Sequence, residues 1–370
     1  MSPSTPKTIA YIATSAGDWG GTSRYLFVML RQLNRERFAP LVLFPAQGPM
    51  LPEMARRGIR HRIWPEHEPH GKLAYARDVV RCLTLLRREK VDLLYVNHVG
   101  YWRPAEMLAA RLLGLPIVTH AHRVVKQAPP YLRFSTLLLT NSHYTATASV
   151  ATPMPRRVIH CPVDVARFDG ARDIRAELGL SADDIVVGFL GQIRRIKGID
   201  TFIELARRIP DPRVRFVIAG ACRDPAKFPG SYTEAQLRAA IAFDPRLRYV
   251  GYRGDVENLY HSADVIVMPS QWDEPFGLIT IEAGASYKPV VASRSGGIPE
   301  IIEHGENGFL VDRFDTAAFA EYTRRLVADP TLSQRMGQNA RRVVEARFVN
   351  KPAQDLEAVL DELLADGHRV

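Results

Sequence analysis

The stretch DVIVMPSQWDEPFGLITIEAGASYKP, residues 264–289, indicates the fold class of this chain. Its first seven residues form a largely apolar run, which is typical of a strand buried on both faces of a parallel sheet. The segment LITIEAGASY predicts a helix that ends before Lys288, and QWDEPFG is the loop between strand and helix. Glu274 in the loop and Glu282 in the helix stand eight residues apart. A strand, a loop and a helix in this order form the repeating unit of doubly wound α/β folds.

The same unit recurs along the chain. Amphipathic stretches such as 22–34, 74–90 and 103–114 predict helices. They alternate with apolar runs that predict strands at 8–14, 40–46, 92–98, 116–122, 136–142, 157–161, 185–191, 214–220, 246–252 and 289–295. We therefore predict an α/β protein with two Rossmann-like doubly wound domains.

The predicted domain boundary lies in CPVDVARFDG, residues 161–170, a proline-containing stretch without strong periodicity. We predict an N-terminal domain over 1–165 and a second domain over 166–348. Residues 349–370 predict a helix that no strand follows, and this helix either caps the second domain or crosses back to the first. Because ligands of open parallel sheets bind beyond the carboxyl ends of the strands, we expect one cleft between two such domains.

The composition is that of a globular protein, with 370 residues, 46% hydrophobic and 24% charged. The cysteines Cys82, Cys161 and Cys222 form no C-x-x-C pair, which suits a reducing cytoplasm. The N-terminal apolar run is too short for a signal peptide, and no segment approaches the roughly 20 apolar residues of a membrane span. We expect a cytoplasmic protein.

The net charge of +9 is unevenly distributed. Residues 1–168 contain 23 Lys and Arg against 10 Asp and Glu, a balance of +13, whereas the remainder contains 26 against 30, a balance of −4. This asymmetry indicates either that the first half meets an anionic surface or substrate, or that its arginines lie on solvated faces. The segments 54–64 and 74–90 combine Arg and Lys with apolar residues, and they either meet an anionic bilayer or pack their apolar faces on the sheet with the arginines solvated.

Two features of the first half follow predicted strands. Gly20 and Gly21 open a helix after strand 8–14, where they form either a structural turn or a loop that admits a ligand close to the backbone. His120 and His122 lie on the same side of strand 116–122. No further His, Cys or acidic cluster nearby completes a metal site, so we expect a cleft role for His122 rather than metal binding.

The second half has a basic turn after strand 185–191. In GQIRRIKGID, the cations Arg194, Arg195 and Lys197 lead into a helix. Cations next to helix-terminal amides favour phosphate binding over a merely solvated loop. Together with Glu274, the amides of Gly277 and Leu278, and Glu282, this turn is suited to bind the sugar, diphosphate and ribose of a nucleotide-sugar.

The motif E-P-F-G-x(4)-E, from Glu274 to Glu282, resembles the signature of retaining glycosyltransferases of family 4, which have the GT-B fold. GGIPEIIEHGENGFLV (296–311), GQIRRIKG and NSHYTA (141–146) are similar to segments of that family. The resemblance covers nearly the whole chain. It implies an acceptor site in the first domain, a donor nucleotide site in the second, and a C-terminal helix that crosses back.

Carried over residue by residue, the resemblance makes Glu282 the ribose contact and Glu274 a partner of the transferred sugar. Lys197, assisted by Arg194, would neutralise the leaving diphosphate, and His122 matches the active-site histidine of the family. The remaining donor contacts that it implies are Gly21, Phe276, Gly277 and Leu278. The function implied is retaining transfer of a sugar from a nucleotide-sugar to a glycan, glycolipid or lipid-linked acceptor, as in polysaccharide biosynthesis.

The sequence departs from the family pattern at two places. Gln192 replaces an expected arginine, so that Arg194 or Arg195 would have to supply the cation, and the hinge contains His160-Cys161-Pro162-Val163-Asp164 instead of N-G-V-D. No D-x-D motif occurs, and we therefore expect that no metal is required. We also expect no other cofactor and no nucleic-acid partner. A sugar-nucleotide epimerase, a glycoside phosphorylase and a silent nucleotide-sugar binding protein are the alternatives. The donor base is not encoded in any recognisable motif.

Overall fold

The computed structural model describes residues 5–16, 20–65, 71–99 and 104–365, and these divide into two compact units. The first unit comprises residues 1–162 and 350–370, and the second comprises residues 163–349. The expected boundaries lay at 165/166 and 348/349, within three residues of these divisions. Each unit has its own parallel sheet and its own hydrophobic core.

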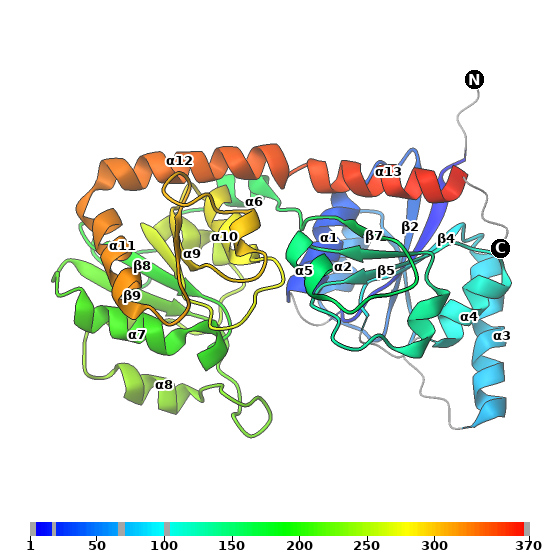
Figure 1. Cartoon of the computed structure of the whole chain (residues 1–370), viewed down its shortest axis with the longest axis horizontal. Helices are drawn as coiled ribbons and strands as arrows, with labels where there is room; N and C mark the ends of the chain where they lie inside the picture. The colour runs from blue at the N-terminus through cyan, green and yellow to red at the C-terminus, as the bar shows by residue number, and fades with distance from the viewer. Residues whose placement is uncertain (1–4, 17–19, 66–70, 100–103, 366–370) are drawn as a thin grey trace. The chain divides into compact units, whose positions relative to one another are not determined.

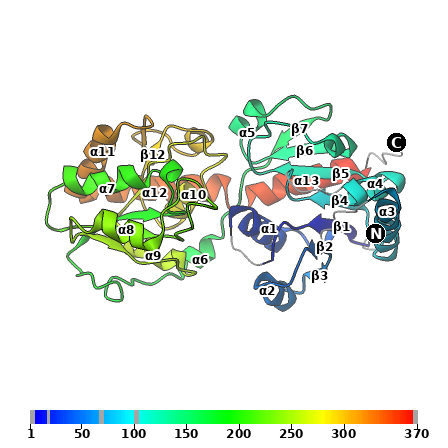
Figure 2. The same ribbon diagram turned by 90° about the horizontal axis from the view of Figure 1, so that it is seen from below.

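The sheet of the first unit has seven parallel strands in the order β3-β2-β1-β4-β5-β6-β7. Figure 2 shows the strands in this sequence, from β7 and β6 at one side to β3 at the other. The order reverses beside β1, which is the place where open α/β sheets bind ligands. The strands are β1 (Lys7–Ile12), β2 (Phe38–Phe44), β3 (Arg60–Ile63), β4 (Leu93–Val96), β5 (Ile117–Ala121), β6 (Leu137–Thr140) and β7 (Arg156–Val158).

Helices cover this sheet with apolar faces that match the sequence pattern. On α3, for example, Val79, Cys82 and Leu86 are buried in the core. The helices are α1 (Gly21–Gln32), α2 (Met50–Arg56), α3 (Lys72–Arg88), α4 (Pro104–Leu112), α5 (His143–Ala148) and the 3-10 turn η1 (Pro130–Phe134). None of the described helices is both long enough and apolar enough to cross a membrane.

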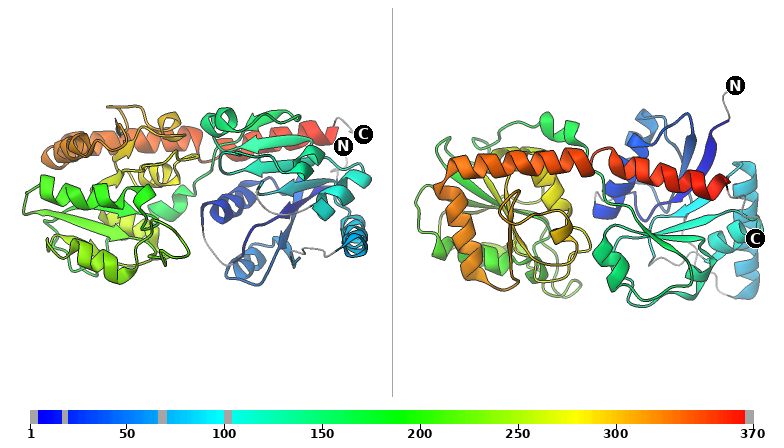
Figure 3. Two further views of the ribbon diagram at one scale, coloured as in Figure 1. Left: turned by 60° about the horizontal axis from the view of Figure 1, so that its bottom comes forward. Right: turned by 45° about the horizontal axis from the view of Figure 1, so that its top comes forward.

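The C-terminal helix α13 (Lys351–Ala365) belongs to the first unit. It buries Leu356 and Leu360, and its Glu357 carboxylate accepts a hydrogen bond from the backbone N–H of Asn34 at 2.6 Å. Glu357 also pairs with Arg37 at 3.0 Å. The helix is drawn in red in Figure 3.

The sheet of the second unit has six parallel strands in the order β10-β9-β8-β11-β12-β13. They are β8 (Ile185–Leu190), β9 (Val214–Ala219), β10 (Leu247–Tyr249), β11 (Val265–Met268), β12 (Val290–Ser293) and β13 (Phe309–Val311). The helices, seen in Figure 1, are α6 (Val165–Asp169), α7 (Ile199–Arg208), α8 (Glu234–Ile241), α9 (Val256–Ser262), α10 (Leu278–Ala285), α11 (Thr316–Ala328) and α12 (Pro330–Arg347), with 3-10 turns η2 (Arg195–Lys197) and η3 (Ile298–Glu300).

The predicted fold class is confirmed, and the two sheets contain every strand that the sequence predicted. Two further strands, β3 and β13, were missed. The sequence of β3 is RHRI, whose charged residues lack the apolar signal of a strand. β13 has only three residues. Both lie at the edge of their sheet, where a short strand needs little apolar surface.

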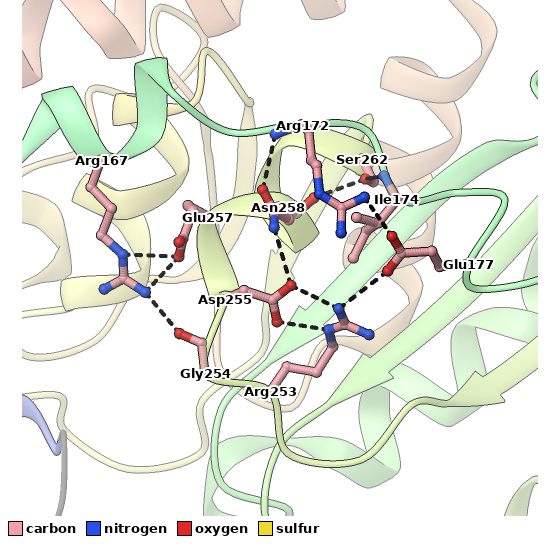
Figure 4. A network of polar contacts seen from close by, with 10 residues as sticks. All are labelled: Arg167, Arg172, Ile174, Glu177, Arg253, Gly254, Asp255, Glu257, Asn258 and Ser262. Carbon is pink, nitrogen blue, oxygen red and sulfur yellow. Dashed lines mark hydrogen bonds and ion pairs between the residues drawn. The ribbon is translucent and has the colours of Figure 1, made fainter. Parts of the chain in front are cut away.

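A polar network fixes the start of the second unit to α9, as Figure 4 shows. The Arg167 guanidinium donates to Glu257 at 2.9 Å, and Arg253 pairs with Asp255 at 2.7 Å. The backbone N–H of Ile174 donates to the Ser262 hydroxyl at 2.8 Å. The contacts of Arg167 and Ile174 hold the segment that follows the domain boundary against α9, in agreement with its place in the second unit.

Helix α12 packs closely against the last turn of α10 and the residues that directly follow it. A Cβ atom at Gly337 would lie 2.0 Å from the backbone oxygen of Tyr287, and one at Gly284 would lie 2.8 Å from Val344 Cγ2. Neither position has room for a larger residue without movement of one helix. This packing fixes α10, which contains Glu282, relative to α12.

We predict that Gly337→Ala destabilises the second unit, because the added methyl group forces α12 away from Tyr287. Overpacking of this kind costs about 1–3 kcal/mol. Differential scanning calorimetry should show a lower Tm, by roughly 2–4 °C per kcal/mol for a unit of this size. Gly254→Ala is the matched control, because a Cβ atom there has no neighbour within 4 Å. Equal Tm values for both variants would contradict this account of the packing.

Candidate active site

Three loops at the carboxyl ends of β8, β11 and β12 pack together in the second unit. The loop after β8 reaches Gly198, whose φ is +80° and whose Cβ position lies 1.8 Å from the Pro269 backbone oxygen. The loop after β12 reaches Gly296, whose φ is +55° and whose Cβ position lies 2.0 Å from the Glu274 backbone oxygen. Only glycine allows both this backbone conformation and this approach. The loops after β8 and β12 therefore both rest on the β11 loop that contains Glu274.

Lys197 and Glu274 form an ion pair within these loops. The Lys197 Nζ atom lies 2.7 Å from Glu274 Oε1, and the side chains are 20% and 6% exposed. The Ser270 hydroxyl donates to the same carboxylate oxygen at 2.6 Å. Lys197 Nζ also lies 4.6 Å from the centre of the Trp272 ring, within the range of a cation–π contact. Because a buried charge must be paired, each member of this pair constrains the other.

The loop after β12, where the segment 296–311 begins, fixes the backbone of the β11 loop. The Gly297 N–H donates to the Glu274 carbonyl at 2.8 Å. The Ser295 hydroxyl donates to the Trp272 carbonyl at 2.6 Å. These two contacts, made by Ser295 and Gly297, fix the backbone of the β11 loop from Trp272 to Glu274.

Helix α10 begins next to this pair without a side-chain cap. Its N-cap is Gly277, with φ of 111°, and its first residue is Leu278. The first turn contains no acidic residue. The first amides of a helix lack intrahelical partners and have positive character, so this end of α10 is suited to an anion.

Glu282 and Phe276 are both buried. The Tyr260 hydroxyl donates to Glu282 Oε2 at 2.9 Å, and Glu282 is 6% exposed. The Phe276 ring is 2% exposed and packs edge-on against Phe348 with ring centres 5.7 Å apart. The Phe276 side chain is therefore part of the core, and the backbone is what this residue can offer to a ligand.

The structure does not bring Arg194 or Arg195 together with Lys197 and Glu274. The Arg194 guanidinium donates to the Pro229 carbonyl at 3.2 Å. Arg195 stacks over the Tyr232 ring at 5.4 Å and pairs with Asp200 at 3.4 Å. Both arginines are thus engaged with other parts of the unit, whereas Gln192, the second residue after β8, is exposed.

In the first unit, the double glycine opens α1. Gly20 is the N-cap and Gly21 the first helical residue, and both are exposed. The helix has no side-chain cap hydrogen bond and no acidic residue in its first turn. Like α10, this helix begins in a manner that is compatible with an anionic ligand.

His122 lies directly after β5, in contact with α1 and with the end of β4. Its Nε2 atom lies 3.0 Å from Asn97 Oδ1. Its ring stacks on His120 with centres 4.1 Å apart and meets Tyr25 edge-on at 4.8 Å. His120 is fully buried, and its Nδ1 atom lies 2.6 Å from the Tyr95 hydroxyl oxygen.

Three neighbouring histidines, His98, His120 and His122, are held neutral, and we call them the histidine cluster. Burial, with a contribution from Arg123, lowers the pKa of His98 to about 4. Burial and the neighbouring His98 lower the pKa of His120 to about 3. Burial, followed by His120 and His98, holds the pKa of His122 well below its usual range. At neutral pH these imidazoles can exchange hydrogen bonds but carry no charge.

Several residues of these two sites were not predicted from the sequence, namely Tyr25, Asn97, Ser270, Trp272 and Tyr260. Asn97 was detectable, because it follows β4 in the position that His122 occupies after β5. Ser270 was detectable for the same reason, since it closely follows β11. Tyr25 and Tyr260 lie within helices, and no local signal distinguishes them from core residues.

The sequence matches two family models that together span most of the chain. The model for glycosyl transferases group 1 matches residues 171–343, and the model for glycosyltransferase family 4 matches residues 19–167.

Individual relatives agree with these matches. D-inositol 3-phosphate glycosyltransferase of Corynebacterium jeikeium is 33% identical over 95% of this chain and 94% of its own length. The protein of the same name from Corynebacterium efficiens is 35% identical over 51% of this chain, and the match spans about half of that protein, 47%. Among solved structures, HepE of Anabaena in complex with UDP superposes with a TM-score of 0.78 at 23% identity, covering 96% of this chain and 100% of that one.

We predict that the first unit loses stability as the pH falls below about 6.5. The folded pKa values of His98 and His120 lie below that of unfolded histidine, so the unfolded chain binds protons that the folded chain does not. The stabilisation is fully present above pH 6.5 and is lost as the pH falls toward 4 and then 3. At pH 5 the loss is about 2 kcal/mol for each histidine.

Urea unfolding at pH 7.5, 6.5, 5.5 and 5.0 measures this loss. His98→Gln should reduce the dependence of the unfolding free energy on pH. His261→Gln, at an exposed histidine of the second unit, is the control for a substitution of this type. A free energy that stays constant from pH 7.5 to 5.0 would show that the cluster does not exclude protons.

Proposed function

The chain belongs to glycosyltransferase family 4, and from this premise we propose that it transfers a sugar from a nucleotide-sugar donor to a hydroxyl group of an acceptor, with retention of configuration. The observation that carries the proposal is the buried Lys197–Glu274 pair next to the uncapped start of α10. The cation and the helix-end amides match the negative charge of a diphosphate, and the carboxylate can accept hydrogen bonds from sugar hydroxyls. The spacing of Glu274 and Glu282 is that of the family signature.

The roles of the second unit follow from these positions. Glu282 accepts hydrogen bonds from the ribose hydroxyls, since a carboxylate accepts several donors besides the Tyr260 hydroxyl. Gly277 and Leu278 offer amides to the phosphates. Lys197 neutralises charge on the leaving diphosphate, which requires its present bond to Glu274 to weaken as the donor binds. Glu274 then becomes available to the transferred sugar.

The charge balance of the donor site makes Lys197 its principal cation. Arg194 donates to Pro229 and Arg195 is stacked on Tyr232, so neither supplies the charge of the arginine that Gln192 replaces unless its loop moves. Helix-end amides supply the remaining stabilisation, and we propose that the reaction needs no metal ion. A chelator such as EDTA should leave the turnover unchanged.

In the first unit, His122 contacts the transferred sugar, and the backbone at Gly21 admits the donor phosphates. The acceptor is a glycan, a glycolipid or a lipid-linked molecule of the kind used in polysaccharide biosynthesis. The relatives are named for transfer to D-inositol 3-phosphate, and this soluble anionic acceptor is therefore included in the tests. The excess of basic residues in 1–168 suits either kind of anionic acceptor.

We predict that Glu282→Gln weakens donor binding. The neutral amide is a poorer acceptor for two ribose hydroxyls, and a loss of about 1.5–3 kcal/mol is typical for hydrogen bonds to charged groups. A thermal-shift screen of UDP-, GDP- and ADP-sugars first identifies the donor, and calorimetry then compares the variants. Tyr260→Phe tests whether the hydrogen bond from the Tyr260 hydroxyl to Glu282 contributes to donor affinity. Glu303→Gln makes the same chemical change at an exposed acid and is the control. Unchanged donor affinity in Glu282→Gln would remove the ribose assignment.

The release of nucleoside diphosphate, measured with and without an acceptor, distinguishes a transferase from a protein that only binds the nucleotide-sugar. Release of nucleoside diphosphate should rise when inositol 3-phosphate or a lipid-linked acceptor is added, and the product should have the anomeric configuration of the donor sugar. Nucleotide release that no acceptor changes would favour an epimerase or a hydrolytic side reaction instead. Binding without release would favour a nucleotide-sugar binding protein.

We also propose that the first unit binds an anionic membrane surface, through a narrower region than the sequence suggested. The apolar residues Val79 and Leu86 of α3 pack in the core and cannot enter a bilayer. In segment 54–64, Arg60 and Arg62 pair with Glu89. What α3 exposes is Leu73 and Val80, 89% and 60% accessible, among the basic residues Lys72, Arg77, Arg87 and Arg88.

We predict that the protein sediments with vesicles containing anionic lipid but hardly with neutral vesicles, and that salt releases it. Each basic residue near such a surface contributes about 1 kcal/mol, so Arg77→Glu with Arg87→Glu should abolish most of the binding. Arg335→Glu with Arg342→Glu makes the same change of charge on exposed positions of α12 and should have little effect. Equal sedimentation with neutral and anionic vesicles at low salt would contradict the membrane proposal.

A further inference from the structure

Asn97 is fully buried at the carboxyl end of β4 and joins His122 to the first turn of α1. Its Nδ2 atom donates to the Thr22 carbonyl at 3.3 Å. Its Oδ1 atom lies 3.0 Å from His122 Nε2. Its own backbone N–H donates to the Ile12 carbonyl at 3.1 Å, which fixes the residue to the end of β1. The amide thus has a defined partner on each side.

These partners determine which way the amide of Asn97 is oriented. The Thr22 carbonyl oxygen can only accept a hydrogen bond, so the NH₂ group of Asn97 must face it. The amide oxygen of Asn97 then faces His122, and an amide oxygen can only accept. The His122 Nε2 atom must therefore carry a hydrogen and donate it to Asn97.

We propose that Asn97 is a positioning residue that holds His122 in the Nε2–H tautomer, so that its Nδ1 atom accepts a hydrogen bond from a substrate hydroxyl. A neutral imidazole carries one hydrogen, and placing it on Nε2 makes Nδ1 the acceptor. This inference rests on the proposed function, because the hydroxyl belongs to the sugar or to its acceptor.

The surroundings of His122 favour the neutral ring that this arrangement requires. His120 stacks on it from β5, Tyr25 meets it from α1, and His98 follows Asn97 after β4. The Asn141 side chain, next to β6, donates to the His122 carbonyl at 3.3 Å and fixes its backbone. No carboxylate contacts the ring among the described residues of this cluster, which agrees with the lowered pKa of His122.

Asn97 links the double-glycine turn at the start of α1 to His122, the two features of the first unit that the sequence singled out. Thr22, which accepts the hydrogen bond from Asn97, directly follows Gly21 at the start of α1. The double-glycine turn and the His122 ring are therefore held by the two ends of one buried amide. A change at Asn97 should disturb the orientation of His122 without touching any donor-binding residue of the second unit.

The tautomer can be observed without any activity. Long-range ¹H–¹⁵N spectra of histidine-labelled full-length protein at pH 7.5 distinguish the two nitrogens of each ring, and His122→Gln identifies the His122 signals among the 11 histidines. We expect His122 to show a single neutral Nε2–H form. A predominant Nδ1–H form, or a charged ring, would overturn the proposal.

Two variants of similar size separate a positioning role from a structural one. Asn97→Leu removes the acceptor and should replace the single Nε2–H form by a mixture, with kcat reduced about tenfold or more. Because Asn97 also holds the turn at Gly21, donor affinity should fall as well, but by a smaller factor than kcat. Asn97→Asp retains an oxygen that accepts from Nε2–H, and it should preserve the tautomer. The ionised carboxylate that Asn97→Asp introduces would stabilise the imidazolium form of His122 and so raise its pKa. The acidic limb of the pH profile of kcat should therefore move to higher pH. Turnover should recover at alkaline pH, where His122 is neutral again.

Equal losses of kcat and the same pH profile in both variants would assign Asn97 a structural role only, provided that circular dichroism shows both to be folded. An unchanged tautomer and unchanged kcat in Asn97→Leu would also overturn the proposal. If wild-type protein shows the Nε2–H form but no acceptor supports transfer, the proposed function fails while the positioning of His122 stands.

Discussion

The second unit depends on one constraint, which is that the Glu274 carboxylate, buried at the carboxyl ends of the parallel strands, is paired with a cation. Glu274 satisfies it with Lys197 at 2.7 Å, and that partner comes from a loop more than seventy residues earlier in the chain. The pair can form because the loops after β8 and β12 approach the β11 loop at Gly198 and Gly296, where any side chain would collide with a backbone oxygen. Both the fold of these loops and the charge of the site follow from this arrangement.

The two units solve the problem of buried polar groups in different ways. The second unit pairs opposite charges and directs the start of α10 to the same region, so that an anionic ligand can exchange partners with Lys197. The first unit buries a group of uncharged rings, in which His120 and His122 are stacked and Asn97 satisfies the histidine nitrogen. A charged site suits a diphosphate, whereas neutral hydrogen-bonding groups suit hydroxyls.

Much of this fold could be predicted from the sequence, because long apolar strands between amphipathic helices have few alternative arrangements. The strand RHRI was missed because its charged residues contradict the pattern, and only pairing with β2 makes it a strand. Lys197, Glu274 and Glu282 could be singled out because of their spacing and their position after strands, and the structure places Lys197 against Glu274. The positions of Arg194 and Phe276 could not be predicted, since contacts with Pro229 and Phe348 arise from tertiary packing. Asn97 carried a positional signal, but its role depends on a carbonyl of α1.

We propose that Lys197 and its neighbouring amides bind the diphosphate of a nucleotide, and calorimetric titration of the free nucleoside diphosphate measures this binding. UDP, GDP and ADP, followed by the monophosphate of whichever binds, should be titrated into the wild type and into Lys197→Gln. We predict that the diphosphate binds more tightly than the monophosphate and that Lys197→Gln reduces this preference by about tenfold or more, as expected for loss of a charge-assisted contact. An equal preference for the diphosphate in both proteins would show that Lys197 does not bind the diphosphate and would place the anion elsewhere.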